Sequence, residues 1–407
     1  MQQQLIAEAP PVSEEERVRA DLALLVERAR RLVPALKARA AKAEKLRRLP
    51  DETVADLHDA GIFRCLQPRR VGGYELDYGC QLDIASELGR GCGSTAWVAV
   101  LVACHHWLLG MYRREVQDEV WGPSSDTLLA TSWGLEKIDA KPAPGGYRLS
   151  GHWKFSSGID HCEWAQLFMP VRDADGTVKP MIAVVPKRDY RIEDAWFAHG
   201  LAGTGSNDIH VEDVFVPEHR TLDMRLLKGR PTPGSAANPG HLYRLPLWVL
   251  FSFNLGSPAI GIARGVLESF IEQAQGRHSA IFDVKMVELP TVQLRVAESA
   301  AEIDAAEAIL QRNNQELNRL ARAGKELDTG FRVRYRRDTS YAATICMRAA
   351  DRLQAATGAH AIAADNPVQR GFRDLRALNA QVALIFDANA IPFGRVALGL
   401  DTGDPRI

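Results

Sequence analysis

Several imidazole and hydroxyl side chains lie in apolar strings where they could hold a small organic molecule. His105 lies in ACHHWLLG, Ser132 in ATSW, and Ser157 in WKFSSG, two residues after Phe155. A neutral imidazole can hold a substrate oxygen because its pKa lies near working pH, and a hydroxyl both donates and accepts hydrogen bonds. Yet a histidine on an apolar helix is often a core residue, and a strand serine often packs without a ligand. Both interpretations stay open on these residues alone.

The sequence contains neither a cysteine motif for a metal site nor a full glycine fingerprint for a dinucleotide. The six cysteines are Cys65, Cys80, Cys92, Cys104, Cys162 and Cys346. They contain no CxxC pair, which fits neither a zinc ribbon nor a dense disulfide framework, so we expect buried thiols and no metal site. Gly203, Gly205 and Ser206 lack the third glycine and the strand-to-helix context of a dinucleotide fingerprint. We expect them to shape a turn.

Composition and charge narrow the possible partners. The 407 residues include 50 Lys and Arg against 51 Asp and Glu, a formal net charge of -1. No summed field would draw in nucleic acid or an anionic membrane, so a small-molecule partner is expected. The first residues lack the pattern of a signal peptide, and the apolar stretch 97–109 is too short to span a bilayer. A cytoplasmic protein without a membrane partner is predicted.

Helical periodicity dominates both ends of the chain. From Glu14 to about Leu49 apolar residues recur at helical spacing, with an interruption expected at Pro34. Further helices are expected at 51–60, ending at a C-cap glycine, and near 82–88 and 94–112. After a Pro- and Gly-rich linker at 229–240, an apolar stripe including Ile303 and Leu310 predicts long helices that pack as a bundle.

Between about Thr127 and Val216 the texture changes to short β-prone runs. The strings PGG at 144–146 and DADG at 173–176 separate them with hairpin turn residues. The fold class is therefore α+β, mainly α, with an antiparallel β barrel or sandwich between two helical parts and no doubly wound sheet. We predict an N-terminal helical domain at 1–124, a β domain at 125–228 and a helical bundle at 229–407.

Particular strings, in this order, resemble the acyl-CoA dehydrogenase superfamily from roughly Glu14 to Asn389. They are GYRLSGHWKFSSG, GTGSNDIHVEDVFVPEHR, GIARG and QRGFRD. RRLPDETVADLHDAGIF, LQPRRVGGYELD and CGSTAWV look closest to its two-component, reduced-flavin-dependent monooxygenase branch, which includes p-hydroxyphenylacetate hydroxylase and a phenolic secosteroid hydroxylase. The resemblance implies an acyl-CoA dehydrogenase fold whose C-terminal part is a four-helix bundle.

The resemblance also locates a position that separates two chemistries. In the commonest arrangement, dehydrogenases of this fold place their catalytic glutamate eight residues after the aspartate of an Arg-Asp pair. Here that pair is Arg373 and Asp374, and the equivalent position is Val382. Valine cannot accept a proton, which disfavours dehydrogenation of an acyl thioester by that arrangement. Some dehydrogenases place the base elsewhere, so an acyl-CoA dehydrogenase or oxidase with a displaced base stays an alternative.

The activity that the resemblance implies is that of a monooxygenase oxygenase component. It would use reduced FMN, or FAD, supplied by a separate flavin reductase, together with O2. A flavin C4a-hydroperoxide, kept from water by an apolar cavity, would hydroxylate a small aromatic or a nitrogen- or sulfur-bearing metabolite. The other alternative is a non-catalytic flavin-binding homologue. By resemblance the protein would be a homotetramer, a dimer of dimers built through helices after Val292.

Cofactor-binding residues follow from the same resemblance. Ser157 matches the hydroxyl that bonds the N5 and O4 edge of the flavin, and Phe155 matches an aromatic packed near the isoalloxazine. Gly205 and Ser206 would shape a turn near the flavin. Arg277 resembles an arginine that pairs with flavin phosphate, although a solvated arginine at a helix end is equally compatible with the sequence.

On the substrate side, the resemblance assigns catalytic roles to His105 and Ser132. Gln381 stands where the phenol hydroxylases keep a second histidine; its amide can orient a substrate but cannot act as a base. Packing at the edge of the bundle is the alternative for Gln381. Either His105 alone activates a phenol, or the substrate needs no deprotonation. Trp133, Phe251 and Phe253 are candidates to line the pocket.

Overall fold

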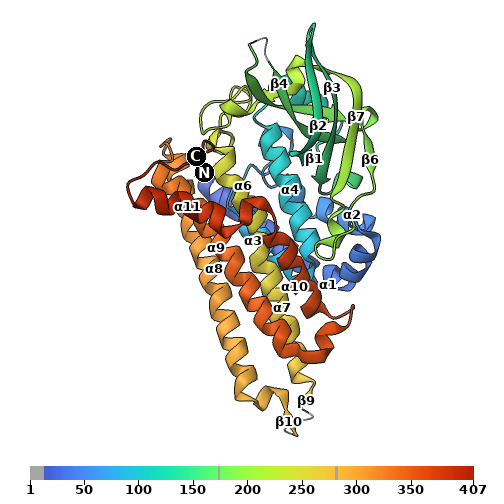
Figure 1. Ribbon diagram of the computed structural model, residues 1–407, viewed down its shortest axis with the longest axis vertical. Helices are drawn as coiled ribbons and strands as arrows, with labels where there is room; N and C mark the ends of the chain where they lie inside the picture. The colour runs from blue at the N-terminus through green and yellow to red at the C-terminus, as the bar shows by residue number, and fades with distance from the viewer. Residues whose placement is uncertain (1–12, 173–174, 280–282) are drawn as a thin grey trace, which may run out of the picture.

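The computed structural model describes residues 13–172, 175–279 and 283–407. The predicted order of a helical, a β and a second helical part is confirmed (Figure 1). The strands of the two large sheets gather at one end of the molecule and the long C-terminal helices extend to the other, with α4 between them. The N-terminal helices are α1 (Glu14–Leu46), α2 (Asp51–Asp59), α3 (Cys80–Gly91), α4 (Gly93–Leu109) and α5 (Arg114–Trp121).

Helix α1 corrects the expectation of an interruption at Pro34. The helix continues through this residue for 33 residues in all. A proline inside a helix lacks the N–H that would bond the carbonyl one turn earlier. Pro34 lies on the exposed face of α1, whereas its neighbour Val33 is buried. Water can therefore satisfy the carbonyl that is left free, and the helix is not forced to end.

Two four-stranded sheets make up the β part. The first has the order β1 (Leu129–Ser132), β4 (Trp164–Arg172), β5 (Val178–Pro186) and β8 (Thr221–Asp223). The second has the order β2 (Gly134–Ala143), β3 (Gly146–Ser156), β7 (Asn207–Pro217) and β6 (Arg191–Glu193). All pairings in these two sheets are antiparallel except that of β1 with β4, which is parallel. Trp153 joins the sheets, since its Nε1 donates to the carbonyl of Phe168 at 2.8 Å.

The predicted turns are found where they fall on described residues. PGG at 144–146 connects β2 to β3, and Gly145 has φ 78°, a left-handed conformation that glycine adopts without steric cost. The chain reverses between β4 and β5 at the DADG string, but its residues 173–174 lie outside the described residues. Gly61, the predicted C-cap glycine, has φ 73° and follows α2.

The C-terminal part is a helical bundle with a small hairpin. Its helices are α6 (Leu247–Gly256), α7 (Pro258–Gln275), α8 (Pro290–Arg322), α9 (Thr329–Thr357), α10 (Pro367–Asn379) and α11 (Phe386–Ala397). Strands β9 (His278–Ser279) and β10 (Val284–Lys285) pair at the far end of α7 and were not predicted. Ile303, Leu310 and Leu317 lie buried along α8, which confirms the predicted apolar stripe.

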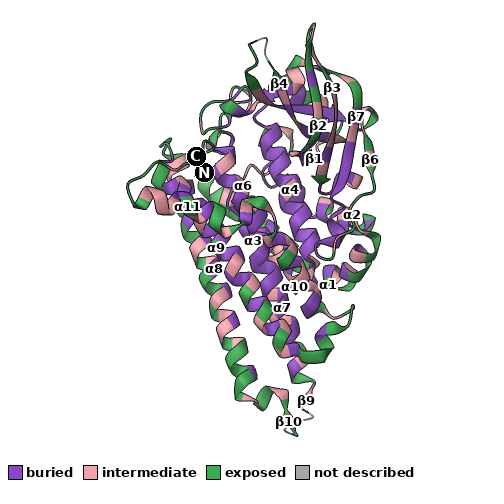
Figure 2. Ribbon diagram, in the orientation of Figure 1, coloured by how far each residue is buried: buried purple, intermediate pink, exposed green. Residues whose placement is uncertain are grey.

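The core runs through the junction of the helical and β parts (Figure 2). Helix α4 is buried at nearly every position, including both histidines. All six cysteines are buried free thiols, as expected. The stretch Leu247–Gln275 is long and apolar enough to cross a bilayer, yet 83% of its most apolar 18-residue window is buried inside the protein, as in the core helix of a globular domain.

Candidate active site

Three buried hydroxyl groups form a chain at the junction of the β sheets and α4. Ser157 Oγ lies 2.7 Å from Ser206 Oγ, which lies 2.8 Å from Thr204 Oγ1. At one end, Trp97 Nε1 donates to Ser157 Oγ at 3.1 Å. At the other end, Thr204 Oγ1 donates to the carbonyl of Leu201 at 2.8 Å. The structure thus brings together two predicted cofactor residues, Ser157 and Ser206, and adds two that the sequence analysis missed.

At any one time the three hydroxyl protons all point the same way along the chain, because each hydroxyl has a single proton. Since Thr204 gives its proton to Leu201, Ser206 donates to Thr204 and Ser157 donates to Ser206. In this state Ser157 Oγ keeps one lone pair beyond the bond from Trp97. It can accept a hydrogen bond from a ligand that carries an N–H or O–H.

The opposite direction is also available to the chain. The carbonyl of Leu201 accepts from Trp196 Nε1 and from the backbone N–H of Thr204, both at 3.1 Å. It therefore stays bonded when Thr204 turns its proton toward Ser206. Ser206 then donates to Ser157, whose own proton becomes free for an acceptor atom. Ser157 can thus meet either a donor or an acceptor on a ligand.

Segments distant in the sequence hold the turn that carries Thr204 and Ser206. The backbone N–H of Leu201 donates to Asp374 Oδ1 on α10 at 2.6 Å, and the N–H of Gly203 donates to Ser94 Oγ on α4 at 3.1 Å. Burial raises the pKa of Asp374 to about 6. Gly205 has φ 54°, and a Cβ there would lie 2.4 Å from an Asp160 carboxylate oxygen. The turn is therefore shaped by glycine, as predicted.

Phe155 stands beside the hydroxyl chain but points outward. Its side chain is 62% exposed and meets Trp196 edge-on, with ring centroids 6.2 Å apart. Its φ of 64° lies in the left-handed region, which is costly for a residue with a Cβ. Such strain persists where surrounding contacts enforce it and is concentrated at functional sites. An exposed aromatic face next to buried hydroxyls suits a flat ring system with a polar edge.

His105 is a buried, neutral imidazole with one nitrogen committed. Its Nδ1 lies 2.7 Å from the carbonyl of Leu129 on β1, so Nδ1 carries the proton and Nε2 is left as an acceptor. Burial lowers the pKa of His105 to about 4. The side chain is therefore a hydrogen-bond acceptor at neutral pH.

The neighbouring His106 has the opposite arrangement. Trp121 Nε1 donates to His106 Nδ1 at 3.1 Å, which leaves the proton on Nε2. That nitrogen is buried without a partner among the described residues. Burial lowers the pKa of His106 to about 3. His106, stacked on Trp121, is a core residue.

Ser132 and Trp133 lie at the end of β1. Ser132 Oγ donates to the carbonyl of Lys154 at 2.5 Å, which holds β3 immediately before Phe155. Trp133 stacks on Phe251 with ring centroids 4.8 Å apart and meets Trp248 edge-on at 5.3 Å. The Nε1 of Trp133 is buried and has no hydrogen-bond partner among the described residues. An apolar aromatic wall with one free donor results.

Three other candidates lie apart from these groups. Phe253 is fully buried and packs against Tyr78 and Tyr335 in the core. Arg277 lies at the far end of α7, beside β9, where its Nη1 donates to the carbonyl of Thr357 at 3.2 Å (Figure 1). The structure of one chain does not bring Arg277 to the hydroxyl chain.

Gln381 caps its own turn. Its Oε1 accepts from the backbone N–H of Ala383 at 2.5 Å, and in the described ranges no hydrogen bond joins it to His105 or Ser157. The adjacent Val382 is 65% exposed. The position that would carry a dehydrogenase base thus presents an aliphatic side chain to the surface.

Comparisons with known proteins identify the family of the chain. The families described as "Acyl-CoA dehydrogenase, N-terminal domain" and "Acyl-CoA dehydrogenase, C-terminal domain" match residues 19–124 and 253–384. The chain is 34% identical to the HsaA oxygenase subunit of a flavin-dependent monooxygenase from Rhodococcus jostii, over 92% of this chain and 98% of the relative. It is 37% identical to the oxygenase component of the FADH(2)-dependent resorcinol hydroxylase from a Rhizobium species, over 89% and 91%.

A solved structure shows the same fold. XiaF from a Streptomyces species, in complex with FADH2 and glycerol, superimposes with a TM-score of 0.90 at 30% identity, over 97% of this chain and 99% of that one. The chain therefore belongs to the acyl-CoA dehydrogenase family. Within that family it is a flavin-dependent monooxygenase of the oxygenase-component type.

Proposed function

We propose that the protein takes reduced flavin from a separate reductase and uses it with O2 to hydroxylate a small aromatic metabolite. The observation that carries this proposal is the buried hydroxyl chain ending at Ser157, beside the exposed ring of Phe155. When bound, the reduced flavin supplies the two electrons that split O2 into one transferred oxygen atom and one water. The protein's own residues bind, orient and exclude water.

The cofactor residues fit a flavin ring system. Phe155 offers an exposed aromatic face, and Ser157 offers a hydroxyl that can donate or accept. A flavin ring changes N5 from an acceptor to an N–H donor on reduction, so a reversible hydroxyl chain can serve both states. Gly205 and Ser206 hold that hydroxyl in place through the turn. One relative is named as FADH(2)-dependent and the XiaF structure is a complex with FADH2, which supports reduced FAD over the FMN that the family resemblance suggested.

The substrate side is proposed to lie between His105, Ser132 and the aromatic wall of Trp133 and Phe251. His105 Nε2 can accept a hydrogen bond from a phenol or a ring N–H. His105 is a poor base. The phenol has a pKa of ~10 and the imidazole a pKa of about 4, so the equilibrium constant for proton transfer from phenol to His105 is unfavourable by roughly a million-fold. We infer that His105 orients the substrate and that no full deprotonation precedes oxygen transfer. The sequence left oxygenation at carbon, nitrogen or sulfur open. Oxygenation at a carbon of an aromatic ring that also bears an O–H or N–H group fits His105 best.

The proposed roles of Arg277 and Gln381 each need a change from the arrangement in one chain: a neighbouring copy for Arg277 and a turned side chain for Gln381. Arg277 can pair with flavin phosphate only if it comes from a neighbouring copy, since it lies at the opposite end of the bundle from the sheets. Such a role would fit the homotetramer that the family resemblance implies, assembled through helices after Val292. Gln381 would turn its amide toward the substrate only by leaving its cap on Ala383. A cytoplasmic location and domain boundaries near 124 and 228 are likewise proposed.

The competing activity is dehydrogenation of an acyl thioester. It requires a carboxylate placed to remove an α proton, and Val382 cannot supply one. A non-catalytic flavin-binding protein would not need a hydroxyl chain whose protons can reverse direction. We therefore favour oxygen transfer over both alternatives.

A single set of measurements tests the proposal. The protein, mixed with reduced FAD under anaerobic conditions and then with O2 and a panel of phenols and indoles, should give products heavier by one oxygen atom. With 18O2 the label should enter the product. If no substrate gains oxygen while acyl-CoA thioesters reduce bound oxidised FAD, the protein is a dehydrogenase. If neither flavin state binds, it is a non-catalytic homologue.

A further inference from the structure

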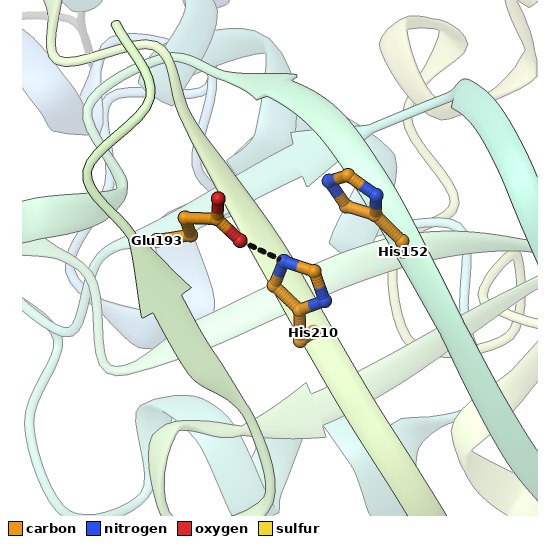
Figure 3. A group of neighbouring side chains, drawn as sticks. All are labelled: His152, Glu193 and His210. Carbon is orange, nitrogen blue, oxygen red and sulfur yellow. Dashed lines mark hydrogen bonds and ion pairs between the residues drawn. The ribbon is translucent and has the colours of Figure 1, made fainter.

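Two histidines lie face to face on the outer surface of the second sheet. The rings of His152 and His210 stack with centroids 4.1 Å apart and an interplanar angle of 17°. Glu193 stands beside them, with its Oε2 2.5 Å from His210 Nε2 (Figure 3). One ligand atom from each of these three residues lies within 4.8 Å of the other two. None of the three belongs to the hydroxyl chain.

Strand register explains the juxtaposition. His152 on β3 and His210 on β7 are direct partners, and Arg191 on β6 pairs with His210. Glu193, two residues after Arg191, therefore points to the same face as His210. Trp153, next to His152, points to the opposite face and is fully buried in the core. The sheet itself gathers the three side chains on one side.

Further carboxylates surround the imidazoles. His152 Nε2 lies 2.6 Å from Asp208 Oδ2, and His152 Nδ1 lies 3.1 Å from Glu136 Oε2. Whichever nitrogen of His152 binds a metal, the other keeps a carboxylate partner, which is the arrangement that orients metal-bound histidines. Glu136 also contacts Lys154, and Glu193 lies 3.9 Å from Arg191. Three carboxylates against two cations leave a net charge of -1 when both imidazoles are neutral.

We propose that His152, His210 and Glu193 bind one divalent transition-metal ion of the Zn2+ class. Two imidazole nitrogens and one carboxylate oxygen form a ligand set that suits this class and not Mg2+ or Ca2+. Ligand atoms around tetrahedral zinc lie about 3.4 Å apart for bonds of about 2.1 Å. The three side chains are partly exposed, so shifts of about 1 Å by rotamer adjustment bring them to that spacing.

The site opens into a groove that leaves room for a further ligand. The groove has a volume of about 550 Å³, and its lining includes Glu136, Ser150, Gly151 and both histidines. Water can complete the coordination from this side, as in zinc sites with three protein ligands. The ion would join β3, β7 and the short edge strand β6, whose last residue is Glu193. It would therefore stabilise the β part without entering the flavin chemistry.

The competing interpretation is a hydrogen-bonded charge network that binds no ion. His219 provides the matched case, because its Nε2 lies 2.5 Å from Glu119 Oε1, the same distance as in the His210–Glu193 pair. His219 has no second histidine within its group among the residues that the structure describes. A substitution there removes one histidine–glutamate bond without touching the proposed metal ligands.

The test is a zinc titration of the full chain, without a histidine tag, after treatment with EDTA and dialysis. Calorimetry at pH 7.5 should show one Zn2+ per chain and no heat with Mg2+. His152→Gln and His210→Gln should each weaken binding at least tenfold, whereas His219→Gln should not change it. Zinc should raise the Tm of the wild type and of His219→Gln only. Circular dichroism and reduced-flavin binding confirm that each variant is folded.

Three outcomes would overturn the proposal. The wild type could fail to bind zinc, His152→Gln or His210→Gln could bind it as tightly as the wild type, or His219→Gln could lose as much affinity as those two variants. Glu193→Gln gives an independent measure, since it keeps both imidazoles. Its affinity should fall while its fold and its flavin affinity stay unchanged. Unchanged affinity in this variant removes Glu193 from the ligand set and contradicts the three-residue site.

Discussion

Removing the Thr204 hydroxyl should change how well the protein distinguishes reduced from oxidised flavin. Thr204→Val removes the hydroxyl that joins Ser206 to the Leu201 carbonyl. Ser206 therefore has no acceptor for its proton when Ser157 donates to it. That direction is the one in which Ser157 accepts a bond from the N–H of reduced flavin. The reverse direction, which suits the N5 acceptor of oxidised flavin, loses only the bond that Thr204 donates to Ser206, and the protons of Ser206 and Ser157 both keep an acceptor. The variant should therefore bind reduced flavin less well and oxidised flavin almost as before.

The size of the effect follows from one hydrogen bond. A net contribution of about 0.5–1.5 kcal/mol corresponds to roughly a 2- to 12-fold change in affinity. We expect the ratio of the dissociation constants, reduced over oxidised, to rise by that factor in Thr204→Val. Anaerobic fluorescence titration measures the reduced state, and an aerobic titration measures the oxidised state. Release of H2O2 per flavin consumed should rise with the loss of affinity.

Thr221→Val is the matched control. Thr221 Oγ1 donates to the carbonyl of Glu218, three residues earlier, at 2.8 Å, just as Thr204 does to Leu201. Both side chains are buried in the β part. The two variants should lose similar stability, about 1 kcal/mol, but only Thr204→Val should alter the ratio. An unchanged ratio in Thr204→Val, or an equal change in both variants, would refute the directional chain.

Three further outcomes are expected. Phe155→Gly should raise the free energy of unfolding by about 1 kcal/mol, because glycine relieves the left-handed φ of 64°. The same variant should bind reduced flavin less tightly in a fluorescence titration. Phe215→Ala, which changes another exposed phenylalanine in the same sheet, should leave that binding unchanged. Burial holds the pKa of His105 at about 4, below the unfolded value of about 6.5, so the unfolded chain takes up the proton first and stability falls as pH drops through that interval. His105→Gln should lose about 3 kcal/mol less than the wild type between pH 6.5 and 4 in urea unfolding, and equal losses would contradict a buried neutral imidazole. Trp133→Phe should raise KM for the substrate without lowering Tm, because it removes a buried N–H that has no protein partner; a drop in Tm with unchanged KM would assign Trp133 to packing alone.

Periodicity predicts the elements of this fold better than their pairings. The long apolar stripe of α8 and the hairpin at PGG are local signals, and both are confirmed. The parallel pairing of β1 with β4 is not local, because Leu129 pairs with Trp164 across an intervening hairpin. The predicted interruption at Pro34 was wrong because the effect of a proline inside a helix depends on its exposure, which a single sequence does not show.

The same limit applies to the candidate site. Ser157 and Ser206 were predicted by resemblance, but their 2.7 Å contact joins residues 49 apart in the chain. Trp97 lies 60 residues before its partner Ser157 in a string that carried only a family signal. The histidine pair was missed because no spacing motif joins positions on β3 and β7, and only strand register places them together.

The bond between the Leu201 amide and Asp374 has a consequence for how the protein is made. The carboxylate that holds the turn at residues 201–206 lies 173 residues later in the chain. A ribosome delivers the β sheets well before it delivers α10. Until then the turn lacks one of its two side-chain anchors, so a nascent chain would present an incomplete flavin pocket. Productive cofactor capture should therefore be a late, post-release event, and truncation before α10 should give folded strands that do not retain flavin.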